Sequence, residues 1–128
     1  MTPAVGADLL SVRNISMRFG GIIALDDVSF DMAAGHIVGL IGPNGAGKTT
    51  LFNCVSRLYT PNSGDVVFEG RSIIKHTPHH VAALGIGRTF QNLALFPSMT
   101  VLQNVMVGVH ARTRSDFLSN ALGLPWVK

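Results

Sequence analysis

A glycine-rich loop at residues 42–50 constrains the fold and the chemistry of this chain more than any other segment. It reads Gly-Pro-Asn-Gly-Ala-Gly-Lys-Thr-Thr, between an apolar run at 36–41 and a segment with helical character from Lys48. Strand, glycine-rich turn and helix, in this order, form the context in which such a loop binds phosphate. Glycines allow successive N–H groups to turn inward around an anion, and the positive end of the helix adds to the same spot. The sequence therefore predicts a nucleotide-phosphate site rather than an ordinary turn.

The loop residues have separate predicted roles. Lys48 would supply a full positive charge to the β- and γ-phosphates, and the Thr49 hydroxyl would ligate a phosphate-bound Mg²⁺. The predicted ligand-binding residues of the loop are Gly42, Pro43, Asn44, Gly45, Ala46, Gly47, Lys48, Thr49 and Thr50.

Composition limits the class of protein. With 128 residues, 47% of them hydrophobic, we expect one globular domain or part of one. A single cysteine, Cys54, excludes an internal disulfide and favours the cytoplasm, and no apolar run approaches the roughly 18 residues of a membrane helix. Acidic residues gather in 1–69 and basic residues in 70–128, but no basic run suggests a nucleic-acid groove. We therefore expect no nucleic-acid partner.

Hydrophobic periodicity and turn residues predict a mixed α/β domain with a helical appendage. We expect Cys54 in the core, and the histidines at 76, 79 and 80 on the surface rather than around a metal. The expected strands are 9–15 with an end at 17–19, 24–32, a buried strand at 36–41, 65–70 and 87–91. The expected helices are 48–57, one opened by Thr77 and Pro78 and ended by Gly85, 101–111 capped by Thr100, and 117–122.

Four stretches together resemble the nucleotide-binding subunit of an ABC transporter: 18–21, 39–50, 60–66, and 88–91 with 95–105. The Pro-Asn-Gly-Ala-Gly interior of the loop is more specific than the generic phosphate-loop frame. The resemblance implies the ABC-type nucleotide-binding domain of the P-loop NTPases, truncated in this chain. Residues 1 to about 90 would form the strand-rich ATP-binding part, and about 91–128 the Q-loop and the start of the helical subdomain.

The resemblance narrows further at Arg88-Thr89-Phe90-Gln91 and the segments 95–97 and 99–101. These are similar to the ATP-binding subunits of branched-chain amino-acid importers. The related lipopolysaccharide-export ATPases usually have Tyr-Leu-Pro-Gln in place of residues 88–91. The implied function is an ATP-binding subunit that couples ATP binding and hydrolysis to import, with ATP and Mg²⁺ as ligands.

The resemblance also implies roles for two residues outside the loop. Phe19 would stack on adenine, although an aromatic residue there could also belong to the core. Gln91 would reach Mg²⁺ and the attacking water, although it could be an ordinary polar loop residue. The implied catalytic residues are Lys48 and Gln91, and the implied metal ligands are Thr49 and Gln91.

The family's signature motif, its Asp-Glu motif and its switch histidine are not found in these 128 residues. The resemblance implies an ATPase at the level of the family, but it does not imply hydrolysis by these 128 residues alone. The alternatives are a non-hydrolysing nucleotide-binding fragment, a lipopolysaccharide-export or soluble ABC protein and, more distantly, a P-loop GTPase or kinase. The implied partners are transmembrane permease subunits, a second ABC ATPase subunit in a homo- or heterodimer and, indirectly, a periplasmic or extracellular substrate-binding protein. The implied location is peripheral, on the cytoplasmic face of the inner (plasma) membrane.

Overall fold

The computed structural model describes residues 6–89 and 95–109. The chain divides into two compact units, Met1–Gly87 and Arg88–Lys128. The first unit contains a sheet and two helices, and the second contains one described helix.

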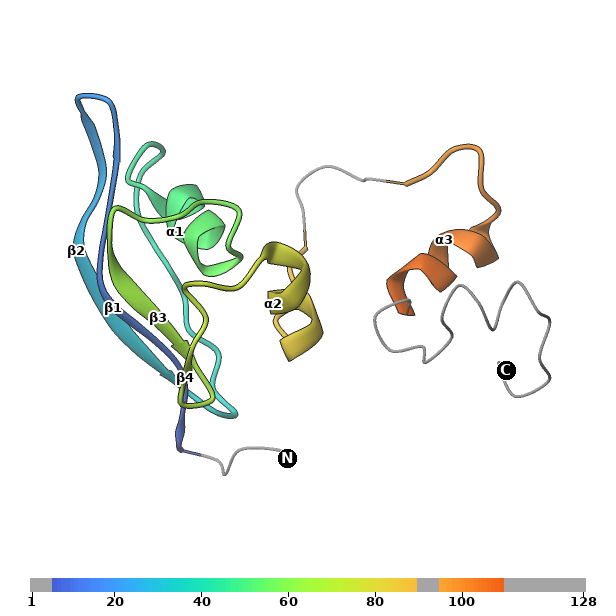
Figure 1. The fold of residues 1–128 in the computed structure, drawn as a ribbon, viewed down its shortest axis with the longest axis horizontal. Helices are drawn as coiled ribbons and strands as arrows, with labels where there is room; N and C mark the ends of the chain where they lie inside the picture. The colour runs from blue at the N-terminus through green and yellow to red at the C-terminus, as the bar shows by residue number, and fades with distance from the viewer. Residues whose placement is uncertain (1–5, 90–94, 110–128) are drawn as a thin grey trace. The chain divides into compact units, whose positions relative to one another are not determined.

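A long antiparallel hairpin forms one side of the first unit (Figure 1). Strand β1 covers Asp8–Phe19 and strand β2 covers Ile22–Ala33, joined by a turn at Gly20 and Gly21. In the second half of β2, Val28, Phe30 and Met32 are half-buried while the residues between them are exposed, as in a strand with one covered face. The strands expected at 9–15 and 17–19 are joined in one strand, with irregular register against β2.

The sheet is antiparallel throughout and has the order β2-β1-β3-β4. Strand β3, Ser63–Phe68, pairs with β1, and the short strand β4, Arg71–Ser72, pairs with β3. The strand expected at 65–70 ends two residues early because Glu69 and Gly70 both have positive φ and turn the chain back.

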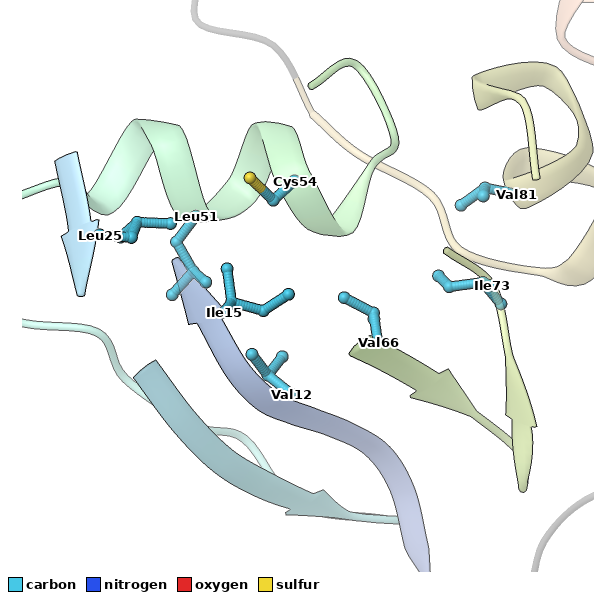
Figure 2. Packing of buried hydrophobic residues seen from close by; sticks show 8 residues of the cluster. All are labelled: Val12, Ile15, Leu25, Leu51, Cys54, Val66, Ile73 and Val81. Atoms are coloured by element: carbon cyan, nitrogen blue, oxygen red, sulfur yellow. The ribbon is translucent and has the colours of Figure 1, made fainter. Parts of the chain in front are cut away.

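Helix α1, Lys48–Val55, supplies apolar side chains to the core of this unit. Figure 2 shows Leu51 of α1 extending toward Ile15 of β1, and Cys54 of α1 and Val66 of β3 belong to the same hydrophobic cluster. All four are buried, which confirms the prediction that Cys54 packs in the core. Removing these apolar groups from water is the main force that holds the helix near the sheet.

Helix α2, Pro78–Leu84, begins and ends where the sequence predicts. The Thr77 hydroxyl accepts a hydrogen bond from the His80 N–H at 3.4 Å, and Gly85 ends the helix with φ of 109°. Val81 is the buried residue of this helix and belongs to the same cluster as Ile73 (Figure 2). His79 and His80 are exposed, as predicted, whereas His76 is half-buried.

The prediction of a strand at 36–41 is wrong, and so is the prediction of a strand at 87–91 for residues 87–89. Residues 36–41 are irregular, and the side chains of Ile37 and Ile41 are 102% and 96% exposed. A strand requires a neighbour to accept and donate its backbone hydrogen bonds. In the ranges 6–89 and 95–109, no strand pairs with this run. Residues 87–89 are likewise irregular, and residues 90 and 91 lie outside the described ranges.

The described helix of the second unit is α3, Val101–Val109. Thr100 begins it as predicted: its hydroxyl accepts from the Gln103 N–H at 3.2 Å, and its own N–H donates to Gln103 Oε1 at 2.9 Å. This reciprocal pair satisfies two N–H groups at the helix start. The expected continuation to 111 and the helix at 117–122 lie outside the described residues. No helix within the described ranges is long and apolar enough to cross a bilayer.

Candidate nucleotide-binding site

The loop 42–50 lies against β2 at Gly47. Gly47 has φ of 95°, and a Cβ added there would overlap the carbonyl oxygen of Ala24 and approach Leu25 Cδ2 to 3.0 Å. Only glycine satisfies both the left-handed backbone and this close approach. Within the loop, the Ala46 N–H donates to the Pro43 carbonyl at 3.2 Å, which closes a tight turn. The sequence thus holds the loop in one place, directly before α1.

The start of α1 is open to an anion. Its N-cap is Gly47, which makes no side-chain capping hydrogen bond, and the first turn contains no acidic residue. The first backbone bond of the helix is from the Leu51 N–H to the Gly47 carbonyl at 2.9 Å. The preceding N–H groups of a helix have no acceptor within it, and the helix dipole adds partial positive charge there. The same N–H groups that a capping side chain would satisfy are therefore available to phosphate oxygens.

Lys48 folds back over the loop that precedes it. Its Nζ donates to the carbonyl oxygens of Gly42 and Pro43, the latter at 2.8 Å. Carbonyl oxygens are neutral acceptors, so neither contact places a negative charge beside the ammonium. Phosphate oxygens would form stronger, charge-assisted bonds with the same group. The site therefore combines the Lys48 ammonium with the backbone N–H groups at the start of α1.

Within the described part of the chain, Thr49 is the residue that could ligate Mg²⁺ beside the loop. Thr49 is exposed in the first turn of α1, where its hydroxyl offers a hard oxygen ligand. No group of three or more His, Cys, Asp or Glu side chains that could hold a metal occurs in residues 6–89 and 95–109. Mg²⁺ commonly binds through one or two protein oxygens together with substrate phosphates and waters. A Thr hydroxyl beside a phosphate loop meets that requirement.

Phe19 lies at the last position of β1 and is 43% exposed, so it is not a core aromatic. Its ring meets that of Tyr59 edge-on, with centroids 5.4 Å apart and planes at 74°. Tyr59 was not among the predicted site residues, although an aromatic residue in the turn after α1 was visible in the sequence. Gln91, the other predicted residue, lies outside the described residues.

A glycine-rich loop held against a strand, an uncapped helix start and a lysine folded over the loop are the features of a P-loop nucleotide-binding protein. The sequence model described as ABC transporter matches residues 25–127. The chain belongs to the ABC transporter family, as the motifs predicted.

Two curated relatives illustrate the similarity. The high-affinity branched-chain amino acid transport ATP-binding protein LivG of Salmonella typhimurium is 41% identical over 117 residues, 91% of this chain and 46% of the relative. The xylose/arabinose import ATP-binding protein XylG of Sulfolobus acidocaldarius is 41% identical over 101 residues, 79% of this chain and 40% of the relative. The chain thus spans about half the length of these curated relatives.

A solved structure shows the same fold. The ADP conformation of an ATP-binding cassette of an ABC transporter superposes with a TM-score of 0.73 and is 33% identical. The match covers 94% of this chain and 47% of that structure. The predicted fold class, a P-loop NTPase domain of the ABC type, is therefore confirmed.

Proposed function

We propose that this chain is the phosphate-binding part of the ATP-binding subunit of an ABC importer, and that the loop 42–50 binds the phosphates of Mg-ATP. The observation that carries the proposal is the position of Gly47 against Ala24, which fixes the loop at the uncapped start of α1. An anion placed there meets backbone N–H groups, a helix dipole and the Lys48 ammonium at once.

Each residue has a defined task in this proposal. The loop and helix N–H groups orient the phosphate chain, and Lys48 exchanges its contacts with the Gly42 and Pro43 carbonyls for phosphate oxygens. The Thr49 hydroxyl ligates Mg²⁺, which neutralises phosphate charge. Phe19 supplies a flat surface for adenine, and Gln91 acts on the metal and the attacking water.

ATP hydrolysis is proposed for the complete subunit and not for a polypeptide of these 128 residues. These residues contain neither an Asp-Glu pair nor a Leu-Ser-Gly-Gly-Gln type sequence. Activation of the attacking water needs a general base, and we propose that the part of the subunit with the Asp-Glu motif supplies it. We therefore expect this polypeptide to bind Mg-ATP without turning it over.

Branched-chain amino acids are the proposed transport substrates, because the LivG relative matches over 91% of this chain. A sugar is the second candidate, since the XylG relative is equally identical over a shorter stretch. Disrupting the gene in its own cell and following uptake of labelled leucine and xylose distinguishes them. Loss of leucine uptake alone supports the first proposal, and loss of xylose uptake alone supports the second.

The proposed partners follow from the same function. They are transmembrane permease subunits, a second ATPase subunit that completes the nucleotide site and, indirectly, a substrate-binding protein outside the membrane. The proposed location is the cytoplasmic face of the membrane, peripheral to it. Closure of two ATPase subunits around ATP would move the permease.

A titration with a fluorescent ATP analogue tests the phosphate site. Lys48→Ala should weaken binding by about 10-fold or more, because a charge-assisted contact is lost. Lys75→Ala is the matched control, since Lys75 is an exposed lysine before α2 and is not part of the loop 42–50. Equal affinity of the Lys48→Ala variant and the unmodified chain would contradict the proposal.

A further inference from the structure

The turn after α1 carries Tyr59, whose ring packs edge-on against the ring of Phe19. Both rings remain partly exposed, Phe19 by 43% and Tyr59 by 37%. An edge-on contact covers at most one face of a ring. Phe19 is therefore restrained by Tyr59 and still has surface on which a nucleotide base can stack.

The backbone at the end of β1 is fixed to the same turn. The Arg18 N–H donates to Asn62 Oδ1 at 2.7 Å, and the Asn62 N–H donates to the Ser16 carbonyl at 2.9 Å. The first bond uses the side chain of Asn62 and the second its backbone N–H, so Asn62 holds both Ser16 and Arg18, the residue directly before Phe19. These hydrogen bonds hold the end of β1 beside the turn, and they therefore support the contact between the two aromatic rings.

Tyr59 is in turn fixed to the end of α1. Its N–H donates to the Asn53 carbonyl at 3.1 Å, and its own carbonyl accepts from Arg57 Nη1 at 2.9 Å. Arg57 is buried, and its Nε donates to the His76 carbonyl at 3.3 Å, so the guanidinium joins the turn to the segment before α2. The position of Tyr59 is therefore set by the helix whose first residue is Lys48.

We propose that Tyr59 is a positioning residue for the nucleotide base, which sets the orientation of the Phe19 ring relative to the phosphate loop. The inference rests on the proposed nucleotide site and deepens it. The loop fixes the start of α1, and Tyr59 is hydrogen-bonded to the end of the same helix. The orientation of the Phe19 ring is in turn set by its contact with Tyr59. Without Tyr59, the Phe19 ring occupies several rotamers, and base affinity falls with the fraction that can stack.

Comparison of two probes separates this role from general destabilisation. ATP engages both the phosphate loop and Phe19, whereas inorganic tripolyphosphate engages the loop alone. Tyr59→Ala should raise the Kd for ATP about fivefold, the range expected for one aromatic contact, and leave the Kd for tripolyphosphate unchanged. Tyr59→Phe should restore the ATP affinity, because it keeps the ring edge. Leu58→Ala is the matched control, an exposed apolar residue adjacent in the chain.

A double-mutant cycle with Phe19→Ala adds a test of the mechanism. If Tyr59 acts through Phe19, Tyr59→Ala should have no further effect on ATP affinity in the Phe19→Ala chain. Additive losses would overturn the inference, and so would equal losses for ATP and tripolyphosphate in Tyr59→Ala. If Lys48→Ala abolishes ATP binding while Tyr59→Ala leaves it unchanged, the inference fails and the phosphate site stands. If Lys48→Ala leaves the binding of both probes unchanged, the phosphate site itself fails, and the inference with it.

Discussion

Gly47 lies so close to Ala24 that a single added methyl group would overlap the carbonyl oxygen of Ala24. The contact joins the phosphate loop to β2, and it couples the sheet to the position of the first turn of α1. Stability and phosphate binding should therefore respond together to changes at this glycine.

Gly47→Ala should destabilise the chain and weaken phosphate binding. The substitution forces a side chain into a left-handed backbone, at about 1–2 kcal/mol, and adds the overlap with Ala24. Gly70→Ala is the control, since Gly70 has φ of 79° with nothing within 4 Å of the added carbon. Urea unfolding should show a larger loss for Gly47→Ala, and titration with tripolyphosphate should be weakened only there. Equal losses for both variants would show that the contact with Ala24 is unimportant.

Replacing Arg57 should lower the free energy of unfolding, and the loss should be smaller for glycine than for alanine. It has φ of 61°, and its buried guanidinium donates to the carbonyls of Tyr59 and His76. Arg57→Ala leaves these acceptors unpaired and should cost about 1–3 kcal/mol of unfolding free energy. Arg57→Gly should cost about 1 kcal/mol less, because glycine adopts positive φ without strain. If the alanine variant is as stable as the glycine variant in urea, the left-handed backbone contributes nothing.

Cys54 should be unreactive in the folded chain. Burial raises the pKa of its thiol above the ordinary value of 9.0, and the Arg57 guanidinium partly offsets this. Because the pKa of the thiol is higher in the folded chain than in the unfolded chain, the unfolded thiol ionises first as the pH rises. The free energy of unfolding is therefore highest below pH 9.0 and decreases above it. A disulfide reagent at pH 8 should label the folded chain much more slowly than the urea-unfolded chain. Equal labelling rates would contradict the burial, and Cys54→Ala should abolish labelling in both states.

The exposed apolar run at 36–41 should promote self-association. Ile37→Lys places a charge on a fully exposed side chain and should lower light scattering while leaving the unfolding free energy nearly unchanged. Val66→Lys is the contrasting variant, because Val66 is fully buried and an unpaired charge there should unfold the unit. Unchanged scattering in Ile37→Lys would show that this run does not mediate association.

Local signals in the sequence predicted most of the elements, and non-local pairing accounts for the errors. The Thr77-Pro78 start, the Gly85 end and the Thr100 cap depend on neighbours within a few residues, and all three are present. The run 36–41 has the composition of a buried strand, but pairing needs a neighbour that its own residues cannot specify. Tyr59 was missed for the same reason, since its contact with Phe19 spans two segments far apart in the chain.

The central claim, that the loop 42–50 binds the phosphates of ATP, is tested most directly by amide NMR spectra during titration with tripolyphosphate. The account predicts that the largest shifts fall on Gly45, Gly47, Lys48 and Thr49, because their N–H groups surround the anion. At the same tripolyphosphate concentration these shifts should be much smaller in Lys48→Ala and unchanged in Lys75→Ala. Shifts that are absent from the loop, or that are the same in Lys48→Ala, would contradict the account.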